Sequence, residues 1–130
     1  MSAGLRFVLA EPRSTLRGVA VAQTLTAVPL AAYPHRVTRV LGQDHRLAPP
    51  AWIVRVLGVR SLLQGAVELR WPTPGLACAG ATVDATHAAS MVFVAARSRR
   101  YRRAALVSGA FATVAAAAQA AAAARELRSN

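Results

Sequence analysis

The hydrophobic residues of this chain fall into four blocks, which are separated by segments rich in arginine or proline. The blocks cover about residues 16–33, 51–70, 75–96 and 104–124. A helix needs roughly 20 mostly apolar residues to cross the hydrocarbon layer of a membrane. The pattern therefore predicts an all-α protein, in which residues 1–130 form a single membrane domain, a polytopic bundle of four transmembrane helices.

The third block carries two ionisable residues, Asp84 and His87, near its middle. At 3.6 residues per turn they share one helix face with the small residues Ala77 and Gly80. Small residues let a neighbouring helix approach closely, which is how membrane helices pack. We therefore expect Asp84 and His87 to point into a helical bundle and away from lipid.

The second block, residues 51–70, carries a polar stripe formed by Arg60, Gln64 and Glu68. These residues follow one another at intervals of four, so that neighbouring side chains can meet along one helix face. Two placements fit this block. It either spans the membrane with the stripe turned into the bundle, or lies in the interface with Trp52 and Trp71 as aromatic anchors.

Energetics favour the spanning placement. An arginine at mid-membrane costs roughly 2.5–3.5 kcal/mol on insertion scales, and Asp84 in the next block offers a counter-charge. The connection at residues 71–75 is short and contains two prolines, so the two helices are expected to be antiparallel neighbours. We expect Arg60 to pair with Asp84, with Gln64 and His87 completing the hydrogen bonds.

Arginine dominates the charge of the chain, whose formal net charge is +11 and whose sixteen basic residues are all Arg. A soluble protein of this charge would suggest nucleic-acid binding. Between apolar blocks, however, arginines are typical of loops that contact anionic lipid headgroups. We expect headgroup contacts, and no nucleic-acid binding, for the arginines of the loop at residues 97–103, namely Arg97, Arg99, Arg100, Arg102 and Arg103.

The segment between the first two blocks is expected to form a brief amphipathic helix at the membrane interface. Val37, Val40 and Leu41 would form its apolar face, and Gly42 would end it. His35 and His45 are ten residues apart, and no regular structure brings them together as a metal pair. The chain has one cysteine and hence no intramolecular disulfide or cysteine-based metal site. We expect neither a metal nor a cofactor.

Two runs of sequence resemble known proteins. GVRSLLQ at residues 58–64, followed by GATVDATHAASM at residues 80–91, is similar to a pattern in small multi-span membrane proteins of high-GC actinobacteria. The similarity covers about the middle third of the chain. It implies that source and a multi-span architecture, carries no activity, and supports a joint role for Arg60, Gln64, Asp84 and His87.

Two functions are compatible with these features. The first is an accessory or assembly subunit of a larger complex in the cytoplasmic membrane, with lipids and another membrane protein or a second copy as partners. Its helix packing would be fixed by a buried polar cluster of Arg60, Gln64, Glu68, Asp84 and His87. The alternative is a small proton-coupled transporter or channel in which Asp84 and His87 titrate. No enzyme is expected, because the sequence has no Gly-rich phosphate loop and no nucleophile with a base at useful spacing.

Overall fold

The computed structural model describes residues 12–40 and 49–129, and these residues are almost entirely α-helical. Within these residues, four long helices and one short helix follow one another, which confirms the all-α prediction. The long helices match the four apolar blocks to within a few residues, and the short helix lies in the first connecting segment. The helices are α1 (Pro12–Ala32), α2 (Pro34–Val40), α3 (Ala51–Arg70), α4 (Pro74–Arg97) and α5 (Arg102–Ser129).

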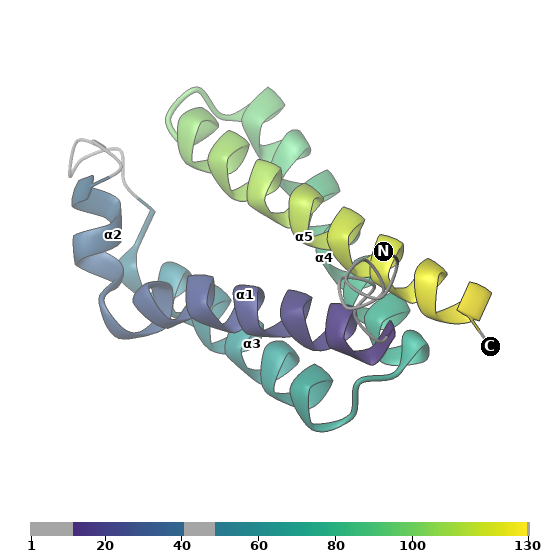
Figure 1. The fold of residues 1–130 in the computed structure, drawn as a ribbon. Coiled ribbons are helices and arrows are strands. Elements are labelled where there is room, and N and C mark those ends of the chain that lie inside the picture. Colours follow the sequence, from purple (N-terminus) through teal and green to yellow (C-terminus); the bar gives the residue numbers. More distant parts are fainter. Residues whose placement is uncertain (1–11, 41–48, 130) are drawn as a thin grey trace, which may run out of the picture.

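The long helices are arranged as two pairs that cross each other. In Figure 1, α1 lies along α3, and α4 lies along α5. α1 also packs on α5, whereas α3 and α4 meet at only a few points. The prediction that α3 and α4 are antiparallel neighbours is therefore wrong, although a short turn does connect them.

Glycines on α3 explain why this helix packs on α1. Gly58 and Gly65 are two turns apart and buried. A Cβ atom on Gly58 would lie 2.8 Å from the Ala31 Cα, and one on Gly65 would overlap the hydroxyl oxygen of Thr24. Only a residue without a side chain permits such a close approach of two helices. The glycine face of α3 therefore lies against α1, and its polar stripe is left to face the α4–α5 pair.

Small residues also line the interface between α4 and α5. Gly109 of α5 is buried, and a Cβ on it would lie 3.1 Å from the Met91 Cβ. Ala95 of α4 and Ala105 and Ala112 of α5 are buried as well. The second pair is thus held by the same close contact of small side chains as the first.

The distribution of side chains is the reverse of that in a water-soluble protein. The buried side chains are mainly alanines and polar residues, whereas large apolar side chains are exposed on every long helix. Leu25 is 67% exposed, Leu63 64%, Val92 65% and Val114 68%. In soluble proteins such residues form the core. Large exposed apolar surfaces are common where proteins contact lipid or another protein.

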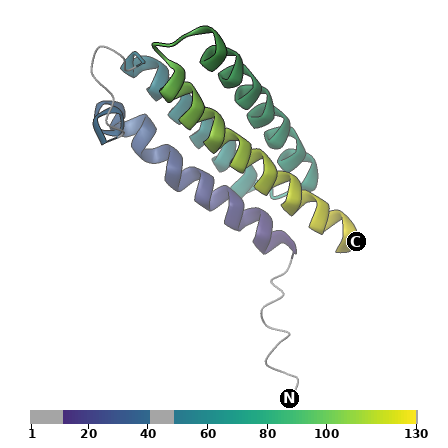
Figure 2. The ribbon, with the colours of Figure 1, turned by 90° about the horizontal axis from the view of Figure 1, so that it is seen from above.

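The bundle has two distinct ends (Figures 1 and 2). The start of α1, the α3–α4 turn and the end of α5 lie at one, here called the proline-turn end. α2 and the α4–α5 turn lie at the other, the arginine-rich end. α2 covers part of the predicted amphipathic helix, while Leu41 and Gly42 fall outside the described residues.

Among the described residues, one helix is long and apolar enough to be a candidate membrane span. This helix is α5, and 22% of its most apolar window is buried. The other long helices carry too many polar, glycine or charged residues to reach the same mean hydropathy. The prediction of four membrane crossings is therefore not confirmed, and the described residues contain one candidate span.

Candidate functional site

The carboxylate of Asp84 lies at the centre of a polar cluster where the two helix pairs cross. Asp84 is 4% exposed and sits halfway along α4. The start of α4 is well defined, because Pro74 occupies its first turn and the Thr73 hydroxyl accepts a hydrogen bond from the Leu76 amide at 3.3 Å. The register of α4 thus places Asp84 where side chains from the other helices converge.

All three other long helices donate hydrogen bonds to this one carboxylate. Arg60 Nη2 of α3 donates to Oδ1 at 3.0 Å. The other oxygen, Oδ2, accepts from Gln23 of α1 at 3.1 Å, Gln64 of α3 at 3.3 Å and Gln119 of α5 at 3.0 Å. A carboxylate offers about four lone-pair sites, and the number of these donors matches that capacity.

Further hydrogen bonds join the donors to one another. Gln119 Nε2 also donates to Gln23 Oε1 at 2.9 Å. Gln64 Nε2 lies 3.4 Å from Glu68 Oε1, and Arg60 Nη2 lies 3.5 Å from Gln64 Oε1. We use the name polar cluster for these six residues, Gln23, Arg60, Gln64, Glu68, Asp84 and Gln119.

The structure brings together four of the five residues that the sequence suggested for the core. Arg60, Gln64, Glu68 and Asp84 all belong to the polar cluster, and the expected ion pair of Arg60 with Asp84 is present. Arg60 remains 31% exposed, whereas the Asp84 side chain is 5% exposed. The positive partner therefore lies at the edge of the cluster and the negative partner at its centre.

His87 differs from the expectation, because its ring bonds to α5 and not to the Arg60–Asp84 pair. Its Nε2 lies 3.0 Å from the Ser108 hydroxyl oxygen. One turn separates His87 from Asp84 on α4, and at Asp84 the glutamine amides occupy the positions that the sequence assigned to the imidazole. The pairing of α4 with α5 thus gives His87 a different partner.

Gln23 and Gln119 were not predicted as members of the cluster. Each is the one amide side chain in its long helix. An isolated glutamine in an apolar helix is a usable signal, since a buried amide needs partners. However, the sequence does not show that both residues, 96 positions apart, meet at the same carboxylate.

The arginines of the α4–α5 turn lie at the surface, beside aromatic rings. The Arg97 guanidinium lies 5.0 Å from the centre of the Phe93 ring, and that of Arg100 lies 5.3 Å from the centre of the Tyr101 ring. Both distances are within the range of cation–π attraction. The neighbouring Arg99, Arg102 and Arg103 are exposed.

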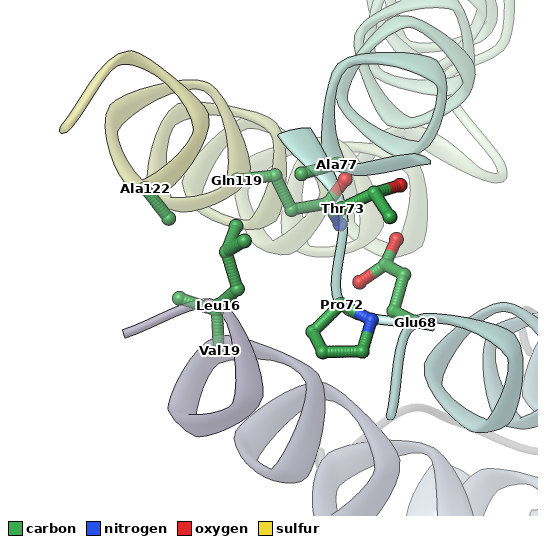
Figure 3. A pocket seen from close by; sticks show the side chains of 8 residues that line it. All are labelled: Leu16, Val19, Glu68, Pro72, Thr73, Ala77, Gln119 and Ala122. Atoms are coloured by element: carbon green, nitrogen blue, oxygen red, sulfur yellow. The ribbon is translucent and has the colours of Figure 1, made fainter. Parts of the chain in front are cut away.

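Two cavities adjoin the polar cluster. An inner cavity of about 10 Å³ lies near the proline-turn end, where Glu68 and Gln119 are part of its wall (Figure 3). An outer cleft of about 520 Å³ runs along α3 and is mostly apolar. The outer cleft is lined by His35, Ala51, Trp52, Arg55, Val56, Val59, Arg60 and Leu63.

Comparisons with known proteins found no relatives of this chain. No protein-family model, curated protein or solved structure matches the chain. Within residues 12–40 and 49–129, no three His, Cys, Asp or Glu side chains come together in a group that could hold a metal ion.

Proposed function

We propose that the protein is a multi-pass protein of the cytoplasmic membrane and acts as an accessory or assembly subunit of a larger membrane complex. The observation that carries the proposal is the distribution of side chains. Polar and charged groups meet in the core, and large apolar side chains form the exterior of all four long helices. This arrangement suits a hydrocarbon solvent.

The polar cluster meets a requirement that a bilayer imposes. Charged groups inside a membrane are costly unless other protein groups compensate them. Asp84 receives donors from every other long helix, and its counter-charge Arg60 comes from α3. α3 has 20 residues and hence a length of about 30 Å, close to the thickness of the hydrocarbon layer.

Exposed hydroxyl groups on α4 support the same environment. Thr82, Thr86 and Ser90 all lie on the exterior, and each donates to a backbone carbonyl of its own helix at 2.8–2.9 Å. Such bonds satisfy a hydroxyl group without water. The exterior of α4 therefore presents no unsatisfied side-chain hydroxyl to lipid at these three positions.

Aromatic residues and arginines occur together at both ends of the bundle. At the proline-turn end Arg70 lies over Trp71, and at the arginine-rich end Arg36 lies over Tyr33, with distances of 5.2 and 5.4 Å from guanidinium carbon to ring centre. Aromatic belts and basic residues are typical of membrane–water interfaces. We propose that Arg97, Arg99, Arg100, Arg102 and Arg103 contact anionic headgroups in this way.

An accessory role fits the core better than a transport path does. The inner cavity of about 10 Å³ has room for roughly one water molecule. The donors of the cluster are used on Asp84 and on one another, an arrangement that fixes the register of four helices. Little of the described chain lies outside the helices, so the apolar exterior is the main surface through which the protein can act.

Two measurements test the proposal in sequence. The protein should stay in the membrane fraction through an alkaline wash and be released by detergent, whereas release by the wash would refute membrane insertion. Tagged protein, purified in mild detergent, should then carry a larger membrane complex in stoichiometric amount, as identified by mass spectrometry. A homo-oligomer without other proteins would refute the accessory role and favour the transporter.

A further inference from the structure

One oxygen in the polar cluster is buried without a hydrogen-bond donor. Gln119 is 1% exposed, and its Nε2 donates to Gln23 Oε1 and Asp84 Oδ2. Its Oε1, in contrast, has no partner among the described residues. Buried polar atoms are nearly always paired, so a native acceptor left without a donor calls for an explanation.

Glu68 is the second unusual group, because it is buried and forms no ion pair with any described residue. It is 6% exposed, and its carboxyl group accepts a hydrogen bond from Gln64. The ion pair found in the described residues joins Arg60 to Asp84, so Arg60 is already used. An ionised Glu68 would be a buried and uncompensated negative charge, which is strongly unfavourable.

Among the side chains that the structure describes, the helices packed around Glu68 supply no other positive charge. α4 presents Asp84, a like charge. α5 presents the neutral Gln119, and its buried residue two turns further on is another acid, Glu126. α1 contributes Leu16 and Val19 to the same cavity, and both are apolar.

The two unusual groups meet beside Gly80. A Cβ on Gly80 would overlap both Glu68 Oε1 and Gln119 Oε1, so both oxygens lie in the space that a side chain would fill. The Gln64 Nε2 atom lies next to the same point, and its hydrogens are used on Glu68 and Asp84. Figure 3 shows Glu68 and Gln119 in the wall of the inner cavity, with Pro72 and Thr73 on its side toward the α3–α4 turn. Two acceptor oxygens placed this way repel each other unless a hydrogen lies between them.

We propose that Glu68 and Gln119 form a binding site for one proton, in which the neutral Glu68 carboxyl donates a hydrogen bond to Gln119 Oε1. One hydrogen satisfies the unpaired amide oxygen and removes the uncompensated charge. A metal ion fits less well, because it needs several oxygen ligands. The site depends on the helical bundle alone, and its test is independent of the accessory role and of membrane insertion.

The proposal predicts how stability changes with pH. The neutral carboxyl is bonded in the folded state, so the stabilisation is present at low pH and is lost as rising pH removes the proton. Glu68→Gln keeps a donor at this position and carries no charge. The Tm of the wild type should therefore fall by about 5 °C as the pH passes the titration of Glu68, while the Tm of E68Q stays level.

Carbon-13 NMR of the full chain in detergent, labelled at the glutamate carboxyl carbon, tests the site directly. The chain has three glutamates, Glu11, Glu68 and Glu126, and the signal of Glu68 is assigned by its loss in E68Q, with E126Q as the control. At pH 7 the Glu68 signal should have the chemical shift of a neutral carboxyl. A carboxylate shift at pH 7 would overturn the proposal and place a water molecule or a cation between the oxygens.

A second pair of variants keeps the test valid if E68Q does not fold. Gln119→Met removes the proposed acceptor and one donor to Asp84, whereas Gln23→Met also removes a donor to Asp84 but leaves Gln119 Oε1 in place. In Q119M the titration of Glu68 should move to lower pH by about one unit, because the neutral form loses its partner. In Q23M it should stay in place. Equal behaviour of the two variants would refute the Glu68–Gln119 contact.

Discussion

Replacing Asp84 with alanine removes the one acceptor that all four long helices share. The Asp84→Ala variant leaves the Arg60 guanidinium without its ion-pair partner. It also leaves amide hydrogens of Gln23, Gln64 and Gln119 without their acceptor in the core. The expected loss of stability is therefore the sum of the costs of several lost hydrogen bonds, and not the cost of one ion pair alone.

The size of the loss follows from these contacts. Each amide hydrogen bond contributes about 1 kcal/mol net, which gives about 3 kcal/mol for the three glutamines. Arg60 is 31% exposed, so solvent reduces the ion pair to about 1–1.5 kcal/mol. We expect Asp84→Ala to lower the free energy of unfolding by about 4 kcal/mol, a large part of the 5–15 kcal/mol typical of native proteins.

A double-mutant cycle separates the contribution of the Arg60–Asp84 ion pair from that of the glutamine hydrogen bonds. Arg60→Ala alone should cost about 1.5 kcal/mol, and the double variant should cost about 4 kcal/mol, less than the sum of the two single losses, because Arg60 has no partner once Asp84 is absent. The free energies come from unfolding in mixed micelles of increasing SDS content, followed by circular dichroism.

Thr86→Ala on the same helix is the matched control. The Thr86 hydroxyl is exposed and bonds to the Thr82 carbonyl of its own helix, so this variant should change stability by less than about 0.5 kcal/mol. Losses of the Arg60 and Asp84 variants that add within about 0.5 kcal/mol would contradict the ion pair. An Asp84→Ala variant as mild as the control would contradict the role of Asp84 as the shared acceptor.

Three further substitutions test the helix packing and the helix start, each by the same unfolding measurement. Gly58→Ala places a Cβ against the backbone of Ala31 and should cost about 1–3 kcal/mol. Gly18→Ala is the control, because no atom lies within 4 Å of the added carbon, and it should stabilise the protein by about 0.5–1 kcal/mol. Equal effects at the two glycines would contradict the close contact of Gly58 with α1. Thr73→Ala removes the oxygen that caps the Leu76 amide and should cost about 1 kcal/mol, whereas an unchanged stability would show that the cap does not contribute.

The sequence alone predicted the helices and the main charged pair. Helix formation depends on residues within a few positions of one another, so apolar blocks bounded by proline and arginine were enough to locate α1, α3, α4 and α5. The spacing of Arg60, Gln64 and Glu68 likewise predicted one polar face on α3. An arginine at mid-membrane needs a counter-charge. Asp84 in the next apolar block offered one, and this made Asp84 the expected partner of Arg60.

Which helices pack together was decided only by the tertiary structure. The short turn favoured α3 against α4, but the closest contacts form where side chains are smallest, and Gly58 and Gly65 face α1. That choice turns the polar stripe of α3 toward the α4–α5 pair and brings Gln23 and Gln119 onto Asp84. The volumes and hydrogen bonds of residues far apart in sequence set this arrangement, and local sequence patterns carry no information about them.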